Sequence, residues 1–198
     1  MSRRAQLMSL LAAASLSLFI AGNAWADAAT KAATASSEVL IIQGPTSGTF
    51  TTPFSDILST SIKVPQGFND LLITVSADTG LITNSTLTFF SSSSLQDVGI
   101  DVRVLVDGNP IITPAPFVMW DDRLRFRRSL ISGFVEDDLT LLGARAFTFT
   151  QPNVGPGDHL VEVQARYRFQ NIDSRFASSS TQAIVGPRTL VVEGVNLK

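Results

Sequence analysis

The sequence predicts an all-β protein, an antiparallel β-sandwich of Greek-key or jelly-roll type with nine or ten strands. Three observations lead to this prediction. Residues 161–169 alternate strictly between apolar or aromatic and charged or amide side chains, as in a strand with one face on a core. Turn signals recur roughly every 8–12 residues. No window shows a sustained helical period, and no repeat of fixed length indicates a propeller or a solenoid.

The other strands follow from the same pattern of apolar runs separated by turn residues. Gly155-Pro156-Gly157 forms the turn before residues 161–169. Asp107-Gly108 is the strongest hairpin signal, because both residues tolerate positive φ, and Pro110 restricts the returning strand to an edge. Turns are also expected at residues 78–80 and at the acidic residues 136–138. The expected strands are residues 38–43, 57–64, 71–77, 81–90, 98–106, 123–127, 139–142, 146–150, 161–169 and 189–197. After the Asp107-Gly108 turn, the apolar pieces at 111–112 and 117–120 are separated by Pro114 and Pro116.

The first 26 residues have the features of an export signal. Arg3 and Arg4 provide a basic start, residues 7–20 are mostly apolar, and Ala24-Trp25-Ala26 offers small residues where a signal peptidase reads. This apolar run is short for a membrane span, which needs about 20 residues, so we expect cleavage after Ala26. The paired arginines also resemble a twin-arginine signal, but its usual aromatic residue is absent, which favours general secretion.

After the signal, the sequence divides into a leader and one domain. Residues 27–37 are almost wholly alanine, serine and threonine, which cannot build a core, so a flexible leader is expected there. The alternative is that this segment, with residues 38–43, adds a strand to a neighbouring subunit. We expect residues 38–198 to form a single β-sandwich domain, since a chain of this size can stabilise one core without disulfides.

Composition restricts the possible chemistry and partners. The 198 residues include no cysteine, which excludes a disulfide framework, a thiolate metal site and a cysteine nucleophile. Cleavage would leave 13 basic and 17 acidic side chains, so bulk charge gives no attraction to nucleic acid. No later apolar run approaches membrane-spanning length, and no transmembrane span is expected in the processed chain. The expected location is the periplasm or the cell exterior.

A basic row is the main candidate for ligand binding. Arg123, Arg125 and Arg127 alternate, and Arg128 follows them. On a strand the first three would project from one face about 7 Å apart, a spacing that would hold an anionic polysaccharide or a lipid headgroup. The competing interpretation is a solvated row that pairs with acids such as those at 121–122.

Two aromatic residues precede this row and extend the candidate site. Phe117 and Trp120 lie among prolines in an expected loop. They would either stack on a sugar ring or cap one end of the core. Together with Arg123, Arg125 and Arg127, they define a candidate carbohydrate-binding surface.

The sequence offers no catalytic residues and no cofactor site. His159 is the only histidine, and no Gly-x-Ser-x-Gly motif accompanies it, so we expect a structural histidine bonded to its turn. One histidine without cysteines leaves no ligand set for a transition metal. The acidic clusters at 121–122 and 136–138 lack a calcium-loop spacing, so calcium stays an unsupported option and solvated turns are expected.

The segment Gly-Pro-Gly-Asp-His-Leu-Val-Glu-Val at residues 155–163, with a last Leu-Val-Val strand, resembles secreted jelly-roll modules of the C1q and tumour-necrosis-factor type. The resemblance covers two or three strands. It implies a binding or assembly module, often trimeric, without catalysis. No binding residue of that family matches a position in this sequence.

These observations predict an exported, non-enzymatic β-sandwich that binds or assembles through its strand edges and loops, as a homo-oligomer or with a protein partner. Two alternatives remain open. One is carbohydrate recognition at Phe117, Trp120 and the arginines of residues 123–128. The other is a small outer-membrane β-barrel. This alternative is disfavoured because such barrels have girdles of aromatic residues, and the sequence contains few tyrosines and tryptophans.

Overall fold

The computed structural model describes residues 30–88, 92–111, 120–131, 133–173 and 177–196. All regular structure in these residues is β-strand, as predicted. Nowhere in this part of the chain is there a helix that could cross a membrane. The predicted export signal falls on residues 1–29 and therefore lies outside the described residues.

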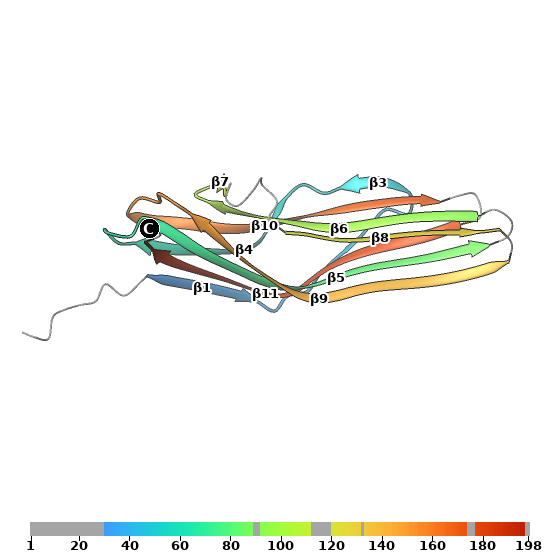
Figure 1. Cartoon of the computed structure of the whole chain (residues 1–198), viewed down its shortest axis with the longest axis horizontal. Helices are drawn as coiled ribbons and strands as arrows, with labels where there is room; N and C mark the ends of the chain where they lie inside the picture. Colours follow the sequence, from blue (N-terminus) through green and yellow to red (C-terminus); the bar gives the residue numbers. More distant parts are fainter. Residues whose placement is uncertain (1–29, 89–91, 112–119, 132, 174–176, 197–198) are drawn as a thin grey trace, which may run out of the picture.

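The described residues form strands β1 to β11, several of them long enough to run the length of the molecule (Figure 1). Their bounds are β1 Lys31–Ser36, β2 Leu40–Gln43, β3 Gly48–Thr51, β4 Ser55–Val64, β5 Asp70–Thr88, β6 Ser92–Val106, β7 Asn109–Pro110, β8 Trp120–Leu130, β9 Phe134–Gln151, β10 Gly157–Asp173 and β11 Ala177–Val195.

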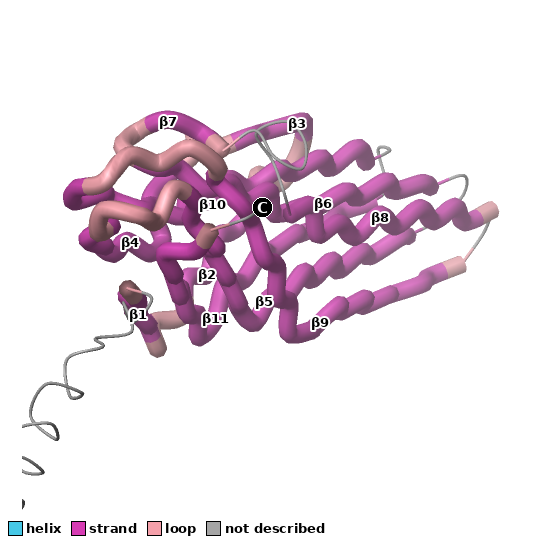
Figure 2. The backbone as a smooth tube through the Cα atoms, turned by 60° about the vertical axis from the view of Figure 1, so that its left-hand side comes forward, coloured by secondary structure: helices cyan, strands magenta, loops and turns pink. Residues whose placement is uncertain are grey.

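The strands form two antiparallel sheets that pack face to face as an elongated sandwich (Figures 1 and 2). The first sheet has the order β1-β11-β5-β9, and β2 continues the line of β1 along β11. The second has the order β3-β10-β6-β7, with β4 and β8 continuing the lines of β3 and β7. We call them the β5 sheet and the β6 sheet. Each therefore has the width of four strands.

The pairing is nested about one hairpin. β6 pairs with β7 and β8, β5 with β9, β4 and β3 with β10, and β2 and β1 with β11. The chain thus folds back on itself as one long ribbon whose successive strand pairs alternate between the two sheets, which is a jelly-roll arrangement. The predicted fold class is confirmed. The described strands form two separate sheets, of five and six strands.

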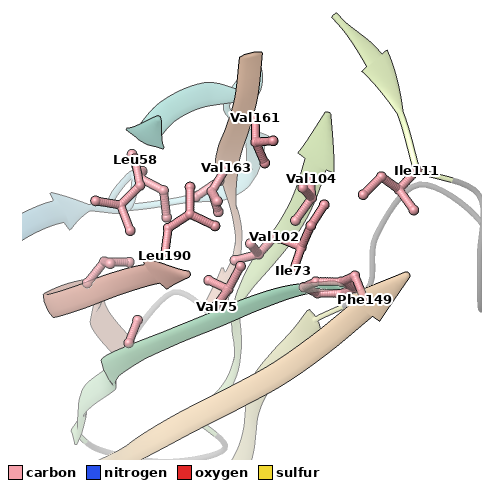
Figure 3. Packing of buried hydrophobic residues seen from close by; sticks show 14 of the residues in the cluster. Leu58, Ile73, Val75, Val102, Val104, Ile111, Phe149, Val161, Val163 and Leu190 are labelled. Carbon is pink, nitrogen blue, oxygen red and sulfur yellow. The ribbon is translucent and has the colours of Figure 1, made fainter. Parts of the chain in front are cut away.

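The hydrophobic core lies between the sheets (Figure 3). Val161, Val163, Ala165, Tyr167 and Phe169 of β10 are all at most 3% exposed, which confirms the alternation in the sequence. They face residues of the other sheet that follow the same two-residue period, including Ile73, Val75, Leu190 and Val192. Each fully buried aliphatic side chain contributes about 1.5–3 kcal/mol relative to leaving it exposed.

The hairpin at the centre of the nested pairing has the predicted turn. Asp107 and Gly108 have φ angles of 52° and 76°, as a two-residue turn between antiparallel strands requires. The returning strand β7 has only two residues, ending at Pro110. Proline has no N–H to give to a ladder, and this agrees with the predicted restriction.

The expectation of a flexible leader at residues 27–37 is wrong for most of its length. Residues Lys31–Ser36 form β1, which pairs with β11 from Glu193 to Arg188. An edge strand needs backbone hydrogen bonds more than large side chains, and Ala32 is large enough to pack on the core. Lys31 Nζ also lies 2.5 Å from Glu193 Oε1.

Two turns expected from the sequence lie inside strands. Residues 78–80 continue β5, and the acidic residues 136–138 belong to β9. These two strands pair without a register shift over the whole interval from Leu71 to Thr88. The ladder hydrogen bonds on both sides of β5 outweigh the local preference of Asp and Gly for turns, because strand propensity depends strongly on context.

A buried arginine holds the irregular part of β11. The register of β11 with β5 shifts between Val185 and Arg188. Arg188, only 4% exposed, donates hydrogen bonds to the carbonyl oxygens of Ile57, Glu38 and Gly186 at 2.9, 2.8 and 3.2 Å. This buried guanidinium therefore joins β11, β4 and the loop before β2, and has a structural role.

Candidate functional surfaces

The outer face of the β6 sheet carries a concentration of charge. Arg166 and Arg168 of β10 lie in register with Asp101 and Gly99 of β6. The Asp101 carboxylate accepts hydrogen bonds from Arg166 Nε at 2.7 Å and Arg168 Nε at 2.9 Å. Its side chain is 3% exposed, whereas the two arginines are about one-third exposed. One buried carboxylate therefore orients two partly exposed guanidinium groups.

An aromatic ring supports the same face. The guanidinium carbons of Arg103 and Arg166 lie 4.1 and 4.8 Å from the ring centroid of Phe54, within the range of cation–π attraction. Arg103 Nε donates to Gln164 Oε1 at 2.8 Å, and Gln164 Nε2 donates to Asp56 at 2.8 Å. These contacts fix the Arg103 side chain before any ligand binds.

The predicted arginine row continues this surface on β8. Arg123, Arg125 and Arg127 are exposed, while Leu124 and Phe126 between them are partly buried. Arg123 Nε donates to Asp97 Oδ1 at 2.9 Å, and its Nη2 donates to Asp97 Oδ2. Within the described part of the chain, Arg125 and Arg127 make no ion pair. Among the described residues, the row therefore has an ion pair at Arg123 and none at Arg125 and Arg127.

The structure thus extends the predicted row into a wider charged face. Among the described side chains it unites six arginines with three carboxylates. The arginines are Arg103, Arg123, Arg125, Arg127, Arg166 and Arg168, and the carboxylates are Asp56, Asp97 and Asp101. We call these nine residues the arginine face. Arg103, Arg166 and Arg168 were not among the predicted site residues, although each occupies a polar position in an alternating strand.

The aromatic part of the predicted site is not placed on this face. Phe117 lies outside the described residues. For Trp120 only the backbone is described, at the start of β8 opposite Val102 of β6. The observed aromatic support for the arginines comes from Phe54 instead.

His159 lies in a cleft of about 460 Å³ between the β6–β7 turn and the loop before β10. Its Nδ1 is 2.7 Å from Asp107 Oδ2, and its Nε2 is 2.7 Å from the carbonyl oxygen of Gly155. The hydrogen bond to Asp107 is the main cause that raises the pKa of His159, while burial opposes it. Because an acceptor faces each ring nitrogen, the cationic imidazole is favoured and neither nitrogen is available as a base.

The acidic cluster at 136–138 does not gather on one side of the chain. Glu136 and Asp138 are exposed, and Asp137 between them is partly buried, because successive residues of β9 face opposite sides of the sheet. Among the described residues, no group of three or more histidine or carboxylate side chains is placed to hold a metal ion.

β9 is the border strand of the β5 sheet, next to β5 (Figure 2). It has 18 residues and pairs along one side with β5, without a bulge. The other three sheet edges in the described residues are each divided between two shorter strands: β1 and β2, β3 and β4, and β7 and β8. β9 contains no proline and no lysine, which are common protections of an edge.

An apolar row leads to this border on the outer face of the β5 sheet. Ile41, Ile184, Gly80 and Leu142 are direct cross-strand neighbours on β2, β11, β5 and β9. Ile41 is 61% exposed and Leu142 is 69% exposed. Exposed apolar groups that adjoin one another are characteristic of interaction surfaces.

No protein-family model and no curated protein matches the chain. The resemblance to C1q and tumour-necrosis-factor modules thus has no family match behind it, although the all-β architecture that it implied is present. Among solved structures, the chain is similar to that of the infectious bursal disease virus Gx strain, with 15% identity over 80% of this chain and a TM-score of 0.23. It is also similar to the infectious bursal disease virus VP2 subviral particle, with 13% identity, 80% coverage and a TM-score of 0.22.

In both cases the chain spans about 37% of the length of the matched viral chain. TM-scores this low do not establish a common fold, so the jelly-roll description depends on the strand order alone.

Proposed function

We propose that the protein is an exported, non-enzymatic assembly module that associates by adding a strand to the free border of β9. The observation that carries this proposal is the length and continuity of that border, 18 residues that pair along one side only with the strands that the structure describes. A long edge without proline presents a row of N–H and C=O groups that another strand satisfies. This is the binding or assembly role, without catalysis, that the resemblance to secreted jelly-roll modules implies.

Two further features support the parts of this proposal. The expected cleavage after Ala26 precedes β1, which begins at Lys31, so processing would leave every described strand intact. The only histidine is engaged at both ring nitrogens, and the buried Asp101 is engaged by two arginines. These groups hold the structure together, which supports a role other than catalysis.

Light scattering coupled to size exclusion, on the processed chain of residues 27–198, tests the assembly role. We expect a mass above that of the monomer, rising with concentration. A strict monomer at the highest attainable concentration would exclude self-assembly. Mass spectrometry of the protein recovered from the producing cells tests export, with Asp27 as the expected first residue.

The arginine face supports a second candidate function, the binding of an anionic polysaccharide. Arg125 and Arg127 are exposed and lie two residues apart on one strand, about 7 Å from each other, while Arg123 is held in place by Asp97. A row of cations at this spacing suits a chain of carboxylate or sulfate groups. This proposal keeps the arginines of the predicted carbohydrate-binding surface but does not include Phe117 and Trp120.

Binding of the processed chain to heparin, a sulfated polysaccharide, tests this candidate. We expect Arg125→Gln combined with Arg127→Gln to weaken retention on a heparin column, with a smaller salt dependence. Lys63→Gln, which removes an exposed cation from β4, is the matched control. Equal retention of both variants would exclude the arginine face as the binding site.

A further inference from the structure

The charges of β9 are distributed unevenly along the strand. Glu136, Asp137 and Asp138 lie near its start, and Arg145 is its only basic residue. Odd-numbered residues of β9 share the inward face of the sheet. Asp137 lies opposite buried Ser85, Leu141 opposite buried Leu81, and Arg145 opposite buried Ala77.

Symmetry restricts how two copies of this border can pair. Identical antiparallel strands are related by a two-fold axis perpendicular to the sheet, and side chains opposite each other then lie on the same face. An odd-numbered residue of β9 can therefore face only an odd-numbered residue of the second copy. Of the three carboxylates, Asp137 alone can lie directly opposite Arg145, because Glu136 and Asp138 belong to the other face.

We propose that a second copy of this chain pairs antiparallel along β9, with the two-fold axis at Leu141. This inference rests on the assembly role proposed above and names its partner and register. Arg145 of each copy then faces Asp137 of the other, so the charge pair occurs twice. The paired segment runs from Phe134 to Thr148, and the two β5 sheets form one continuous sheet.

The other contacts of this register are compatible with close pairing. On the inward face, Leu139, which is 38% exposed in the single chain, lies opposite Gly143. Val135 lies opposite Phe147. On the outward face, the carboxylates at 136 and 138 lie opposite Ala146 and Ala144, so like charges do not meet.

Neighbouring registers lack the charge pair. With the axis at residue 142, Arg145 faces Leu139 and Asp137 faces Phe147. With the axis at residue 140, Arg145 faces Val135 and Asp137 faces Gly143. The Arg145 guanidinium already lies over Gly143, since a Cβ there would be 2.7 Å from Arg145 Nη1. It therefore lies along its own strand, on the inward face that the proposed charge pair uses.

Charge exchange in the processed chain tests the pairing. Arg145→Asp places two carboxylates opposite each other, and Asp137→Arg places two guanidinium groups opposite each other, twice per interface. Each single variant should weaken dimerisation at least about tenfold. The double variant D137R/R145D restores opposite charges and should recover dimerisation. Circular dichroism of each variant shows whether the fold is retained. The double variant contains both substitutions, so if it dimerises again, the single variants lost a charge pair and did not misfold.

A single cysteine tests the register. The Cα atoms of directly opposite residues are about 4.5–5.5 Å apart, within the range of a disulfide. Leu141→Cys should therefore form a disulfide-linked dimer in a chain that has no other cysteine. Ala144→Cys is the control, because the two copies of residue 144 would be separated by six residues along the strand, roughly 20 Å.

The outcomes separate this inference from the assembly role. A wild-type dimer that tolerates both charge reversals, or that cross-links at residue 144 in preference to 141, overturns the β9 register and leaves self-assembly standing. A wild-type monomer at all concentrations overturns both. A dimer that follows the charge exchange and cross-links at residue 141 establishes the register.

Discussion

The contact between His159 and Asp107 makes one residue pair sensitive to pH. Asp107, at the β6–β7 turn, accepts hydrogen bonds from His159 and from the backbone N–H of Leu160 at 2.9 Å. The pair ties this hairpin to the start of β10. The hydrogen bond raises the pKa of His159 above 6.5 and lowers the pKa of Asp107 below 3.8, with burial opposing the change in both. Asp158 adds a smaller attraction for the histidine cation.

We predict that this pair stabilises the fold most between the two ordinary pKa values. The contribution of His159 is complete below pH 6.5 and is lost as the pH rises through its raised pKa. The contribution of Asp107 is present above pH 3.8 and is lost as the pH falls through its lowered pKa. Urea unfolding of wild type and His159→Gln should therefore differ more near pH 5 than near pH 9. A proton NMR titration of this single histidine giving a pKa of 6.5 or lower would contradict the prediction.

At the scale of elements, the chain changes sheet between β2 and β3 at a position that accepts only glycine. Gly44 donates its N–H to the carbonyl oxygen of Thr181 at 2.8 Å. A Cβ at this position would lie 2.5 Å from Cδ1 of the buried Phe169. We predict that Gly44→Ala destabilises the fold by about 1–3 kcal/mol, the usual cost of overpacking.

Urea unfolding measures this loss, with Gly155→Ala as the matched control. Gly155 has no atom within 4 Å of its would-be Cβ and no positive φ, so its replacement should change stability by less than about 0.5 kcal/mol. Equal stability of the two variants would show that the crossing can widen.

The elements that the sequence predicts correctly are those whose local pattern and tertiary setting agree. The alternation at 161–169 and the Asp107-Gly108 turn are examples, since one face is buried and the turn is tight. The errors arise where pairing overrides local preference. Glycine and aspartate at 78–80 lie inside β5 because strands on both sides bond to it, and the alanine-rich leader becomes β1 because β11 supplies a free edge.

The arginine face shows the same limit for a site. Alternation alone places Arg123, Arg125 and Arg127 on one side of β8, and the structure agrees. The proximity of Arg166 and Arg168 depends on the register of β10 with β6. The register of two strands is set by long-range packing, so the sequence of either strand alone does not determine it. The sequences of β8 and β10 both alternate clearly, so the outward position of their arginines is predictable. That these arginines form one surface is not predictable from either sequence.

At the scale of the whole molecule, the interior of the sandwich changes character along its length. β5 runs through both parts. Its first half contributes Leu71, Ile73 and Val75 to an apolar core. Its second half places the buried polar residues Thr83 and Ser85 between the buried leucines Leu81 and Leu87 on the same inward face. Other fully or nearly fully buried polar residues surround this second part, namely Ser94, Gln96, Asn171 and Thr181. Gln96 Nε2 donates across the sheets to the Asn84 carbonyl oxygen at 3.1 Å.

This polar interior leaves some hydrogen-bonding capacity unused, and the wild-type sandwich should be correspondingly less stable there. Thr83 is fully buried, and its hydroxyl has no hydrogen-bond partner among the described residues. Valine has nearly the same shape without the hydroxyl, so Thr83→Val should raise the free energy of unfolding by about 1 kcal/mol.

Thr181→Val is the control, because Thr181 Oγ1 accepts a hydrogen bond from Asn171 Nδ2 at 3.4 Å, and the loss of this bond should not stabilise the fold. Equilibrium unfolding in urea measures both variants. A Thr83→Val protein that is no more stable than wild type would mean that the hydroxyl is satisfied, by an internal water for example, and that this half of the sandwich is not weakened by it.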